Sequence, residues 1–167
     1  MYKGALLQKC SQSKCETPRD NGIVPHDTPT PDDAARCPCL SGNSYGDCCA
    51  PIHRGAGLAP TAERLMRSRF SAFALGLPEY LLDSWHPSTR PEELELDPHL
   101  RWQLLDILRT ERGGPFDRTG IVEFRATFRD GTGTVTGTGG STRGELHETS
   151  SFVREGQRWY YVDGVTD

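Results

Sequence analysis

The chain has 167 residues, a formal net charge of −4 and 35% hydrophobic residues. This length accommodates one ordinary domain plus a small accessory module, and the low apolar share indicates that part of the chain stays outside a packed core. The negative charge argues against a general nucleic-acid-binding protein, because such a protein needs a basic face to replace the counterions of the phosphates.

The apolar runs of the sequence are short, and none approaches the length of a secretory leader or a membrane span. We therefore expect a cytoplasmic protein without membrane association. In that compartment thiols stay reduced, so the six cysteines favour metal binding over a framework of disulfides.

Residues 1–35 are polar and rich in Pro, Asp, Thr and Ser, without an apolar period. Pro25, Pro29 and Pro31 interrupt any helix, so we predict a flexible N-terminal tail. Cys10 and Cys15 lie in this tail. Two interpretations of them stay open, namely free thiols in a flexible segment or half of a second metal site.

The next segment, residues 36–55, contains a cluster of four cysteines: Cys37, Cys39, Cys48 and Cys49. Turn-forming residues 41–46 separate the two pairs and can fold the second pair back onto the first. Four sulfur ligands satisfy tetrahedral zinc and leave no open position, so the pattern predicts a structural zinc site. Reduced or oxidisable thiols without a metal are the alternative. Arg36, His53 and Arg54 flank the cluster and are expected to offset its negative charge.

A helix is predicted to begin after Thr61, a favourable N-cap, with Glu63 at the positive end of the helix dipole. Apolar residues at helical spacing form one stripe: Ala62, Leu65, Met66, Phe70, Phe73, Ala74 and Leu77. Arg64, Arg67 and Arg69 make the helix locally basic, which is typical of a solvated face.

A second, shorter helix is predicted over residues 79–85, and the hydrophobic period then changes from helical to alternating. The alternation predicts four strands, over residues 102–109, 121–128, 146–154 and 158–162. Residues 131–144 are mainly Gly and Thr and are expected to form a mobile hairpin loop. Since the connections are too short for crossover helices, we predict an α+β domain over residues 60–167, with helices packed on a curved antiparallel sheet.

A curved sheet wrapped on helices often encloses a ligand, so aromatic and titratable residues of these elements are pocket candidates. They are Trp85, His86, Trp102, Asp106, His147, Trp159 and Tyr161. His147 and its neighbour Glu148 point to opposite faces of their strand, and a carboxylate on a neighbouring strand would make His147 a candidate general base. His86 is alternatively a helix-capping residue, and His147 a solvated or hydrogen-bonded strand residue.

Alternation also places four residues of the first strand on one face: Trp102, Leu104, Asp106 and Leu108. If that face is internal, Asp106 requires a partner, and Arg125 or Arg129 of the next strand is the candidate for a structural ion pair. In the last strand, Trp159 and Tyr161 share one face, and Tyr160 and Val162 share the other. One pair is expected in the core, and the other is expected to line the pocket or to pack on the zinc site.

The segment from Cys37-Pro38-Cys39 to Cys48-Cys49, with Ser41-Gly42 and Tyr45 inside it, resembles the SEC-C motif. Further segments resemble the YchJ family: residues 62–73, 80–82, 85–91, 113–116, 146–148 and 158–164. The resemblance covers about residues 36–165. It implies zinc ligation by the four cysteines and a cone-like domain of the nuclear transport factor two-like or cystatin-like type, with a pocket.

In the preprotein translocase ATPase, the SEC-C motif is a docking module for a chaperone and the ribosome, helped by lysines. This sequence differs, because Asn43, Ser44, Gly46 and Asp47 stand where lysines are usual, and Leu40 stands where glycine is usual. The resemblance therefore does not carry an acidic docking partner over to this chain.

From these observations we expect a non-enzymatic, zinc-containing binding or adaptor protein whose cone domain holds a small apolar ligand or a protein partner. One alternative is an enzyme that uses His86, Asp106 or His147 as acid–base groups on a small molecule. The other is a thiol redox or zinc-handling protein that uses Cys48 and Cys49. The sequence contains no glycine-rich phosphate loop followed by lysine, no G-x-S-x-G and no H-E-x-x-H.

Overall fold

In the computed structural model of the chain, residues 31–131 and 142–166 are described. The predicted tail up to residue 30, with Cys10 and Cys15, lies outside the described residues, as does most of the predicted 131–144 loop. The elements in chain order are α1 (Ala50–His53), α2 (Ala62–Leu75), α3 (Pro78–Asp83), β1 (Leu100–Arg112), β2 (Thr119–Asp130), β3 (Thr142–Glu155) and β4 (Arg158–Thr166).

Helix α2 begins and ends where its capping residues predict. The Thr61 side chain accepts a hydrogen bond from the Arg64 backbone N–H, and Gly76 closes the helix with a left-handed φ of 68°. Helix α3 begins at Pro78, a favourable first position, and ends at Asp83, two residues before the predicted end. Among the described residues, no helix is both long and apolar enough to cross a bilayer.

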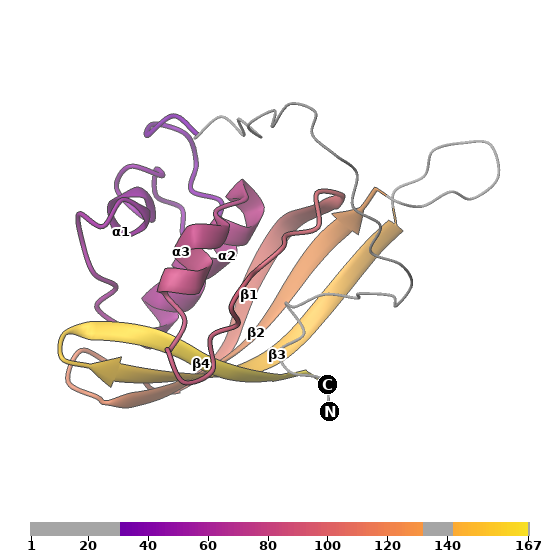
Figure 1. Cartoon of the computed structure of the whole chain (residues 1–167). Helices are drawn as coiled ribbons and strands as arrows, with labels where there is room; N and C mark the ends of the chain where they lie inside the picture. The colour runs from indigo at the N-terminus through magenta and orange to yellow at the C-terminus, as the bar shows by residue number, and fades with distance from the viewer. Residues whose placement is uncertain (1–30, 132–141, 167) are drawn as a thin grey trace, which may run out of the picture.

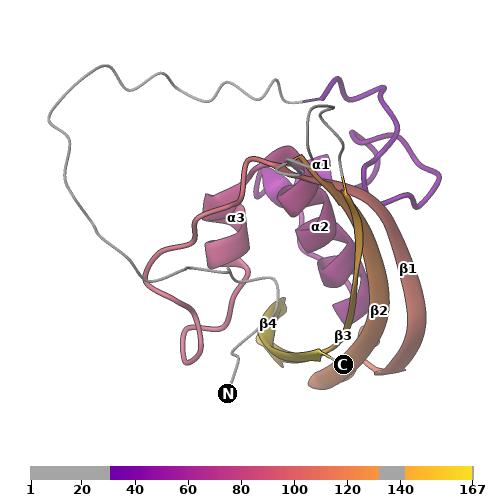
Figure 2. The same ribbon diagram turned by 90° about the vertical axis from the view of Figure 1, so that its right-hand side faces the viewer.

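The four strands form one sheet in the order β1-β2-β3-β4, and every neighbouring pair is antiparallel. The sheet curves around α2 on one side (Figures 1 and 2). The predicted arrangement of helices packed on a curved antiparallel sheet is confirmed. Each strand is longer than its predicted range, because the outer ends leave the core and lose the alternating pattern on which the prediction rests.

The space between α2 and the sheet is filled mainly by aromatic and aliphatic side chains. The largest buried members of this core are Met66, Phe70, Trp85, Phe124, Phe152, Trp159 and Tyr161. Trp85 meets Tyr161 edge to face, with ring centroids 4.8 Å apart. Three of the predicted pocket residues, Trp85, Trp159 and Tyr161, are therefore core residues. Trp102 packs on Phe70 and Phe73 from β1.

The predicted faces of β1 are wrong because the strand contains two irregularities. Its register with β2 shifts after Trp102 and again after Ile107, and each shift inserts a residue that reverses the alternation. Leu105 is 4% exposed and joins the core, whereas Leu104 is 37% exposed. The members of the predicted face that lie exposed instead are Leu104, Asp106 and Leu108.

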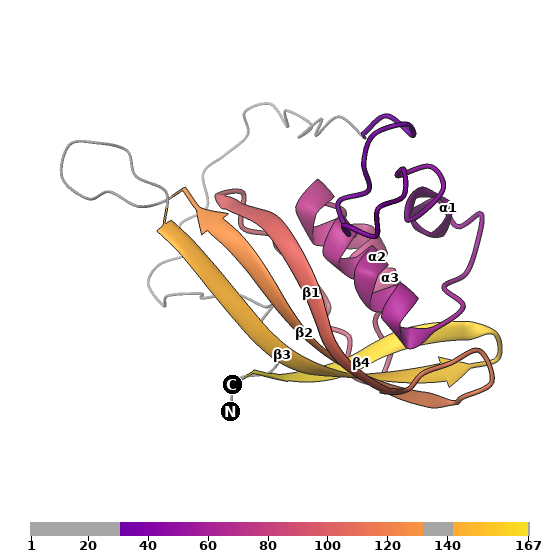
Figure 3. The ribbon, with the colours of Figure 1, turned by 180° about the vertical axis from the view of Figure 1, so that it is seen from behind.

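Residues 31–60, which we call the cysteine segment, pack beside α2 (Figure 3). The buried residues of the segment form a small cluster of their own, to which α2 contributes Leu75: Cys37, Cys39, Tyr45, Cys48, Cys49 and Ala50. Ala59 and Ile52 reach into the main core. Helix α2 therefore contributes to the main core and to the cluster of the cysteine segment, and its Ala72 and Phe73 join a third cluster with Leu81 and Leu94.

Candidate functional site

The four cysteines converge on one point. Their sulfur atoms all lie within 4.8 Å of one another, and the side chains are at most 3% exposed. Cys39 Sγ lies 3.5 Å from Cys48 Sγ, which in turn lies 3.8 Å from Cys49 Sγ. Four ligands placed tetrahedrally at about 2.3 Å from an ion are about 3.8 Å apart, so the spacing fits one metal ion.

Tight turns bring the two cysteine pairs together. The Cys37 N–H donates to the Asn43 carbonyl at 3.0 Å, and the Leu40 N–H donates to the Cys37 carbonyl at 3.0 Å. Leu40 adopts a left-handed φ of 58°, a conformation that favours glycine. The loop between the pairs is therefore closed by backbone hydrogen bonds, at the expense of one strained residue.

Ionisation of the clustered thiols also favours a bound cation. Hydrogen bonding to Cys39 and Cys49 lowers the pKa of the Cys37 thiol to about 3. Hydrogen bonding to Cys37 and Cys39, together with burial, raises the pKa of the Cys49 thiol. Four adjacent buried thiolates repel one another, so a cation must be present for all of them to ionise. The cluster is a candidate metal centre on its geometry and on its donor set.

Helix α2 supplies polar contacts to this cluster. Arg64 Nη1 donates to Cys48 Sγ at 3.1 Å, and its Nη2 donates to the Cys48 carbonyl at 3.2 Å. Arg67 Nη1 donates to the Cys39 carbonyl at 3.3 Å. The Ser71 hydroxyl lies 3.5 Å from Cys37 Sγ. The prediction that the arginines of this helix form a solvated face is therefore wrong.

Two of the three residues predicted to offset the charge of the cluster, His53 and Arg54, have other roles. His53 Nε2 donates to the Ser68 carbonyl at 2.8 Å, and His53 Nδ1 accepts from the Tyr45 hydroxyl at 2.9 Å. Burial lowers the pKa of His53, which keeps the ring neutral in this tautomer. Arg54 forms an exposed ion pair with Asp33. Arg64 takes the place that the sequence assigned to these residues.

The titratable pocket candidates do not converge. His86 contacts the Ser88 hydroxyl and the Glu155 carboxylate. His147 Nε2 lies 3.0 Å from Glu123 Oε1, on the face of the sheet opposite to that of the buried Phe124. A carboxylate of the neighbouring strand does pair with His147, and the same Glu123 side chain also pairs with Arg109.

Asp106 is exposed on the outer side of β1. In the strand register it stands opposite Arg125, which is one of its two expected partners. Arg125 Nε, however, lies 3.1 Å from Glu145 Oε1. Asp106 therefore lies outside the core, whereas His86 contacts Glu155 at the end of β3.

Sequence reasoning missed a buried cation, Arg69, which is 1% exposed. Its guanidinium carbon lies 5.1 Å from the Trp85 ring and 4.4 Å from the Tyr161 ring, and Nη1 donates to Leu81 O and Ser84 Oγ. Burial lowers the pKa of Arg69 to about 10. The available signal was its position four residues after Leu65 and four before Phe73, on the apolar stripe.

Sequence reasoning also left Glu148 unassigned, although alternation places it on the same face as Ser150 and Phe152. Glu148 Oε1 accepts hydrogen bonds from the Ser150 hydroxyl at 2.6 Å and the Tyr161 hydroxyl at 3.3 Å. Burial raises the pKa of this carboxyl group. The neighbouring strand carries Gly164 here, where a Cβ atom would lie 2.2 Å from Glu148 Oε1.

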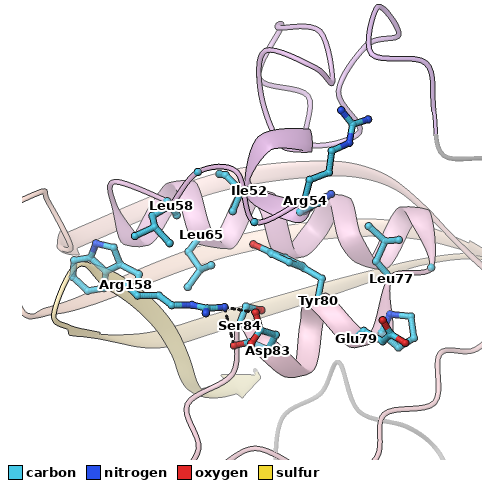
Figure 4. A pocket seen from close by; sticks show the side chains of 17 residues that line it. Ile52, Arg54, Leu58, Leu65, Leu77, Glu79, Tyr80, Asp83, Ser84 and Arg158 are labelled. Atoms are coloured by element: carbon cyan, nitrogen blue, oxygen red, sulfur yellow. Dashed lines mark hydrogen bonds and ion pairs between the residues drawn. The ribbon is translucent and has the colours of Figure 1, made fainter.

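A cleft of about 720 Å³ opens between the cysteine segment, helix α3 and the start of β4. Figure 4 shows Ile52, Leu58 and Leu65 along one side, with Asp83 and Arg158 grouped across from them. The Arg158 guanidinium donates to the Asp83 carbonyl and carboxylate. The cleft thus combines an apolar wall with a polar rim.

Tyr80 projects from α3 into the middle of this view (Figure 4). Its hydroxyl lies 2.5 Å from Ser68 Oγ, and its ring centroid lies 4.5 Å from that of His53. Burial raises the pKa of Tyr80 to about 12, so the phenol stays protonated. Of the predicted pocket residues, Trp159 lines the cleft, whereas the other six do not.

Known proteins share this sequence and fold. Residues 61–164 match the family described as "YchJ, middle NTF2-like domain". A UPF0225 protein of Corynebacterium glutamicum is 48% identical over 132 residues, which are 79% of this chain and 98% of the relative. A UPF0225 protein of Corynebacterium efficiens is 51% identical over 129 residues, which are 77% of this chain and 92% of the relative.

Two solved structures are similar as well, and both are named as SEC-C motif containing proteins. The one from Rhodopseudomonas palustris has a TM-score of 0.63 and 31% identity, covering 78% of this chain and 98% of its own. The one from Psychrobacter arcticus has a TM-score of 0.58 and 28% identity, covering 81% and 85%. The chain therefore belongs to the YchJ family, whose middle domain is NTF2-like.

Proposed function

We propose that this protein is a zinc-stabilised binding protein. In this proposal the four cysteines hold a structural Zn²⁺, and the cleft beside the cysteine segment binds a small, largely apolar ligand. The observation that carries the proposal is the composition of the cleft, whose walls come from both the cysteine segment and the α+β region. Zinc would stabilise one wall and the hydrophobic core the other.

The donor set supports zinc in a structural role. Four thiolates complete a tetrahedral shell and leave no position for a water or a substrate, so the ion would organise the chain instead of reacting. The cysteines are also nearly fully buried, which protects such an ion from solvent. Zn²⁺ would stabilise the segment by joining the two cysteine pairs, because the segment has few other buried apolar side chains.

The cleft supports binding more than acid–base catalysis. Its volume of about 720 Å³ lies within the range that small-molecule sites occupy, roughly 300–1,000 Å³. Leu58 and Ile52 provide apolar surface, while Tyr80 and Arg158 provide polar groups that can orient a ligand. His86, His147 and Asp106 do not line the cleft. His53 does line it, but its two ring nitrogens are occupied by the Ser68 carbonyl and the Tyr45 hydroxyl.

Metal analysis tests the first half of the proposal. Protein purified without added zinc should contain about one zinc per chain, released by a chelator only slowly or after unfolding. A protein that carries iron with visible absorption, or that carries no metal, would contradict the zinc assignment.

A fluorescent apolar probe, anilinonaphthalene sulfonate, tests the second half. Leu58 is 51% exposed and lines the cleft, whereas Leu108 is 44% exposed on the outer side of β1, so the two leucines form a matched pair. Leu58→Glu should weaken probe binding about tenfold, equivalent to about 1.4 kcal/mol, and Leu108→Glu should leave it unchanged. Equal losses in both variants, or no binding to the parent protein, would contradict a ligand cleft at this place.

A further inference from the structure

The two arginines of α2 that reach the cysteine segment contact it in different ways. Arg64 donates hydrogen bonds to Cys48 from both terminal nitrogens, one to the sulfur at 3.1 Å and one to the carbonyl oxygen at 3.2 Å. Arg67 reaches only a backbone carbonyl, that of Cys39, and its Nε pairs with Glu63 at 2.8 Å. The charge of Arg67 is thus already matched, whereas that of Arg64 faces a cysteine sulfur.

We propose that Arg64 is a positioning residue of the metal centre, which sets the affinity and the reactivity of the site through the Cys48 thiolate. This inference rests on the proposed zinc site. One Zn²⁺ and four thiolates carry a net charge of −2, and burying that charge is costly unless a cation is close. The half-buried Arg64 guanidinium supplies such a cation by a charge-assisted hydrogen bond.

Other charges near the cluster do not replace Arg64. Arg54 is paired with Asp33, and His53 is held neutral by burial and by its two hydrogen bonds. Among the described residues, Arg64 is the arginine that donates to a cysteine sulfur. A hydrogen bond to a ligating thiolate withdraws electron density from the sulfur and fixes its orientation toward the ion.

Two serine hydroxyl groups also lie close to cysteine sulfur atoms of the cluster. Ser41 Oγ lies 3.1 Å from Cys48 Sγ, and Ser71 Oγ lies 3.5 Å from Cys37 Sγ. Arg64 and Ser71 lie seven residues apart on α2, and therefore on one side of the helix. Since α2 also packs against the sheet, the α+β region itself orients the sulfur ligands, and the metal affinity belongs to the whole chain and not to the cysteine segment alone.

The test compares three variants of the full chain. Arg64→Met removes the charge but keeps much of the volume, Arg64→Lys keeps the charge but loses the forked geometry, and Arg67→Met is the control on the same helix. Competition with a chelator of known affinity measures the zinc dissociation constant. We expect about 10–100-fold weaker zinc binding in Arg64→Met, an intermediate loss in Arg64→Lys, and a change within about threefold in Arg67→Met.

A spectroscopic readout separates this role from a merely structural one. With Co²⁺ in place of zinc, the sulfur-to-metal charge-transfer band should move to lower energy in Arg64→Met, because the Cys48 thiolate loses its hydrogen bond. The same variant should lose zinc faster to a thiol-alkylating reagent, since its thiolate is more nucleophilic. Neither readout should change in Arg67→Met.

The outcomes distinguish a failure of the role proposed for Arg64 from a failure of the proposed metal site. Equal losses in Arg64→Met and Arg67→Met would indicate a general loss of contact with α2 and would overturn the role of Arg64. Parent affinity and an unmoved charge-transfer band in Arg64→Met would overturn it too. A parent protein that binds neither Zn²⁺ nor Co²⁺ would overturn the proposed metal site itself, together with the role of Arg64.

Discussion

The two sides of helix α2 are stabilised by different physics. On the sheet side, aromatic and aliphatic side chains from distant parts of the chain bury against one another, as the contact of Trp85, which follows α3, with Tyr161 of β4 illustrates. On the other side, the buried cluster consists mostly of cysteines, with Tyr45 and Ala50. Hydrophobic burial is the main stabilising contribution on the first side, whereas the second side has few apolar side chains and presents a candidate metal centre and hydrogen bonds from α2.

One helix can therefore contribute to two kinds of stabilising contact, namely those of the hydrophobic core and those of the cysteine segment. The apolar stripe of α2 serves the core, and the residues between the stripe positions serve the cysteine segment. We expect the two systems to be separable in experiments, although the contacts of Arg64 and Ser71 couple them. Four predictions test this separation, in order of decreasing effect.

The largest effect should follow Cys39→Ser, which removes one sulfur ligand. We expect the zinc to be lost and residues 36–55 to unfold, because structural zinc contributes on the order of 10 kcal/mol to such small modules. The sheet should remain folded, with a modest loss of stability from the uncovered side of α2. Hydrogen exchange should therefore rise across the cysteine segment and stay slow in β2 and β3. Fast exchange throughout would show that the two sides form one cooperative unit.

Arg69→Ala should destabilise the core side by about 3–5 kcal/mol, since it leaves a cavity between Trp85 and Tyr161 and removes two hydrogen bonds. Urea denaturation measures this loss. Zinc content should not change, because Arg69 faces the core. Arg67→Ala is the control on the same helix and should cost less than about 1 kcal/mol. A loss of zinc in Arg69→Ala would show that the two sides are more tightly coupled than proposed.

Glu148→Gln should change the pH dependence of stability. Burial raises the pKa of Glu148 above its ordinary value of 4.5, so the native state favours the protonated carboxyl, and its contribution to stability is lost as the pH rises through the raised pKa. Glutamine does not titrate, so the free energy of unfolding of the variant should increase relative to that of the parent as the pH rises.

The control for this pH series is Glu145→Gln, on the same strand but exposed and paired with Arg125. Its stability difference from the parent should lack the rise that Glu148→Gln shows. A difference between Glu148→Gln and the parent that stays constant from acidic to neutral pH would contradict the raised pKa.

The smallest effect concerns the turn of the cysteine segment. Leu40 has a φ of 58° and is 44% exposed, so Leu40→Gly should relieve strain while losing little packing. We expect Leu40→Gly to be more stable than Leu40→Ala by about 1 kcal/mol, because alanine keeps the Cβ atom that opposes this conformation. Thermal unfolding of the zinc-loaded variants measures the difference, and equal melting temperatures would argue against strain at this position.

The features that depend on neighbouring residues could be predicted from the amino-acid sequence. The caps of α2, its apolar stripe, the antiparallel order of the strands and the grouping of the cysteines all follow from local spacing. These features agree with the structure because turns, helix periods and short connections act over a few residues. The opposite orientations of His147 and Glu148 on their strand also follow from alternation, although the burial of Glu148 was not predicted.

The features that depend on which residues pack against a side chain could not be predicted and are seen in the folded chain. The register shifts in β1 arise from its pairing with β2 and moved Leu104 and Asp106 to the exposed side. The roles of Arg64 and Arg69 depend on which cluster each side of α2 meets, and the cleft exists because the cysteine segment lies beside α3. A sequence pattern records the chemistry of a side chain, but its partner is chosen by chain segments that are distant in sequence and meet only in the folded state.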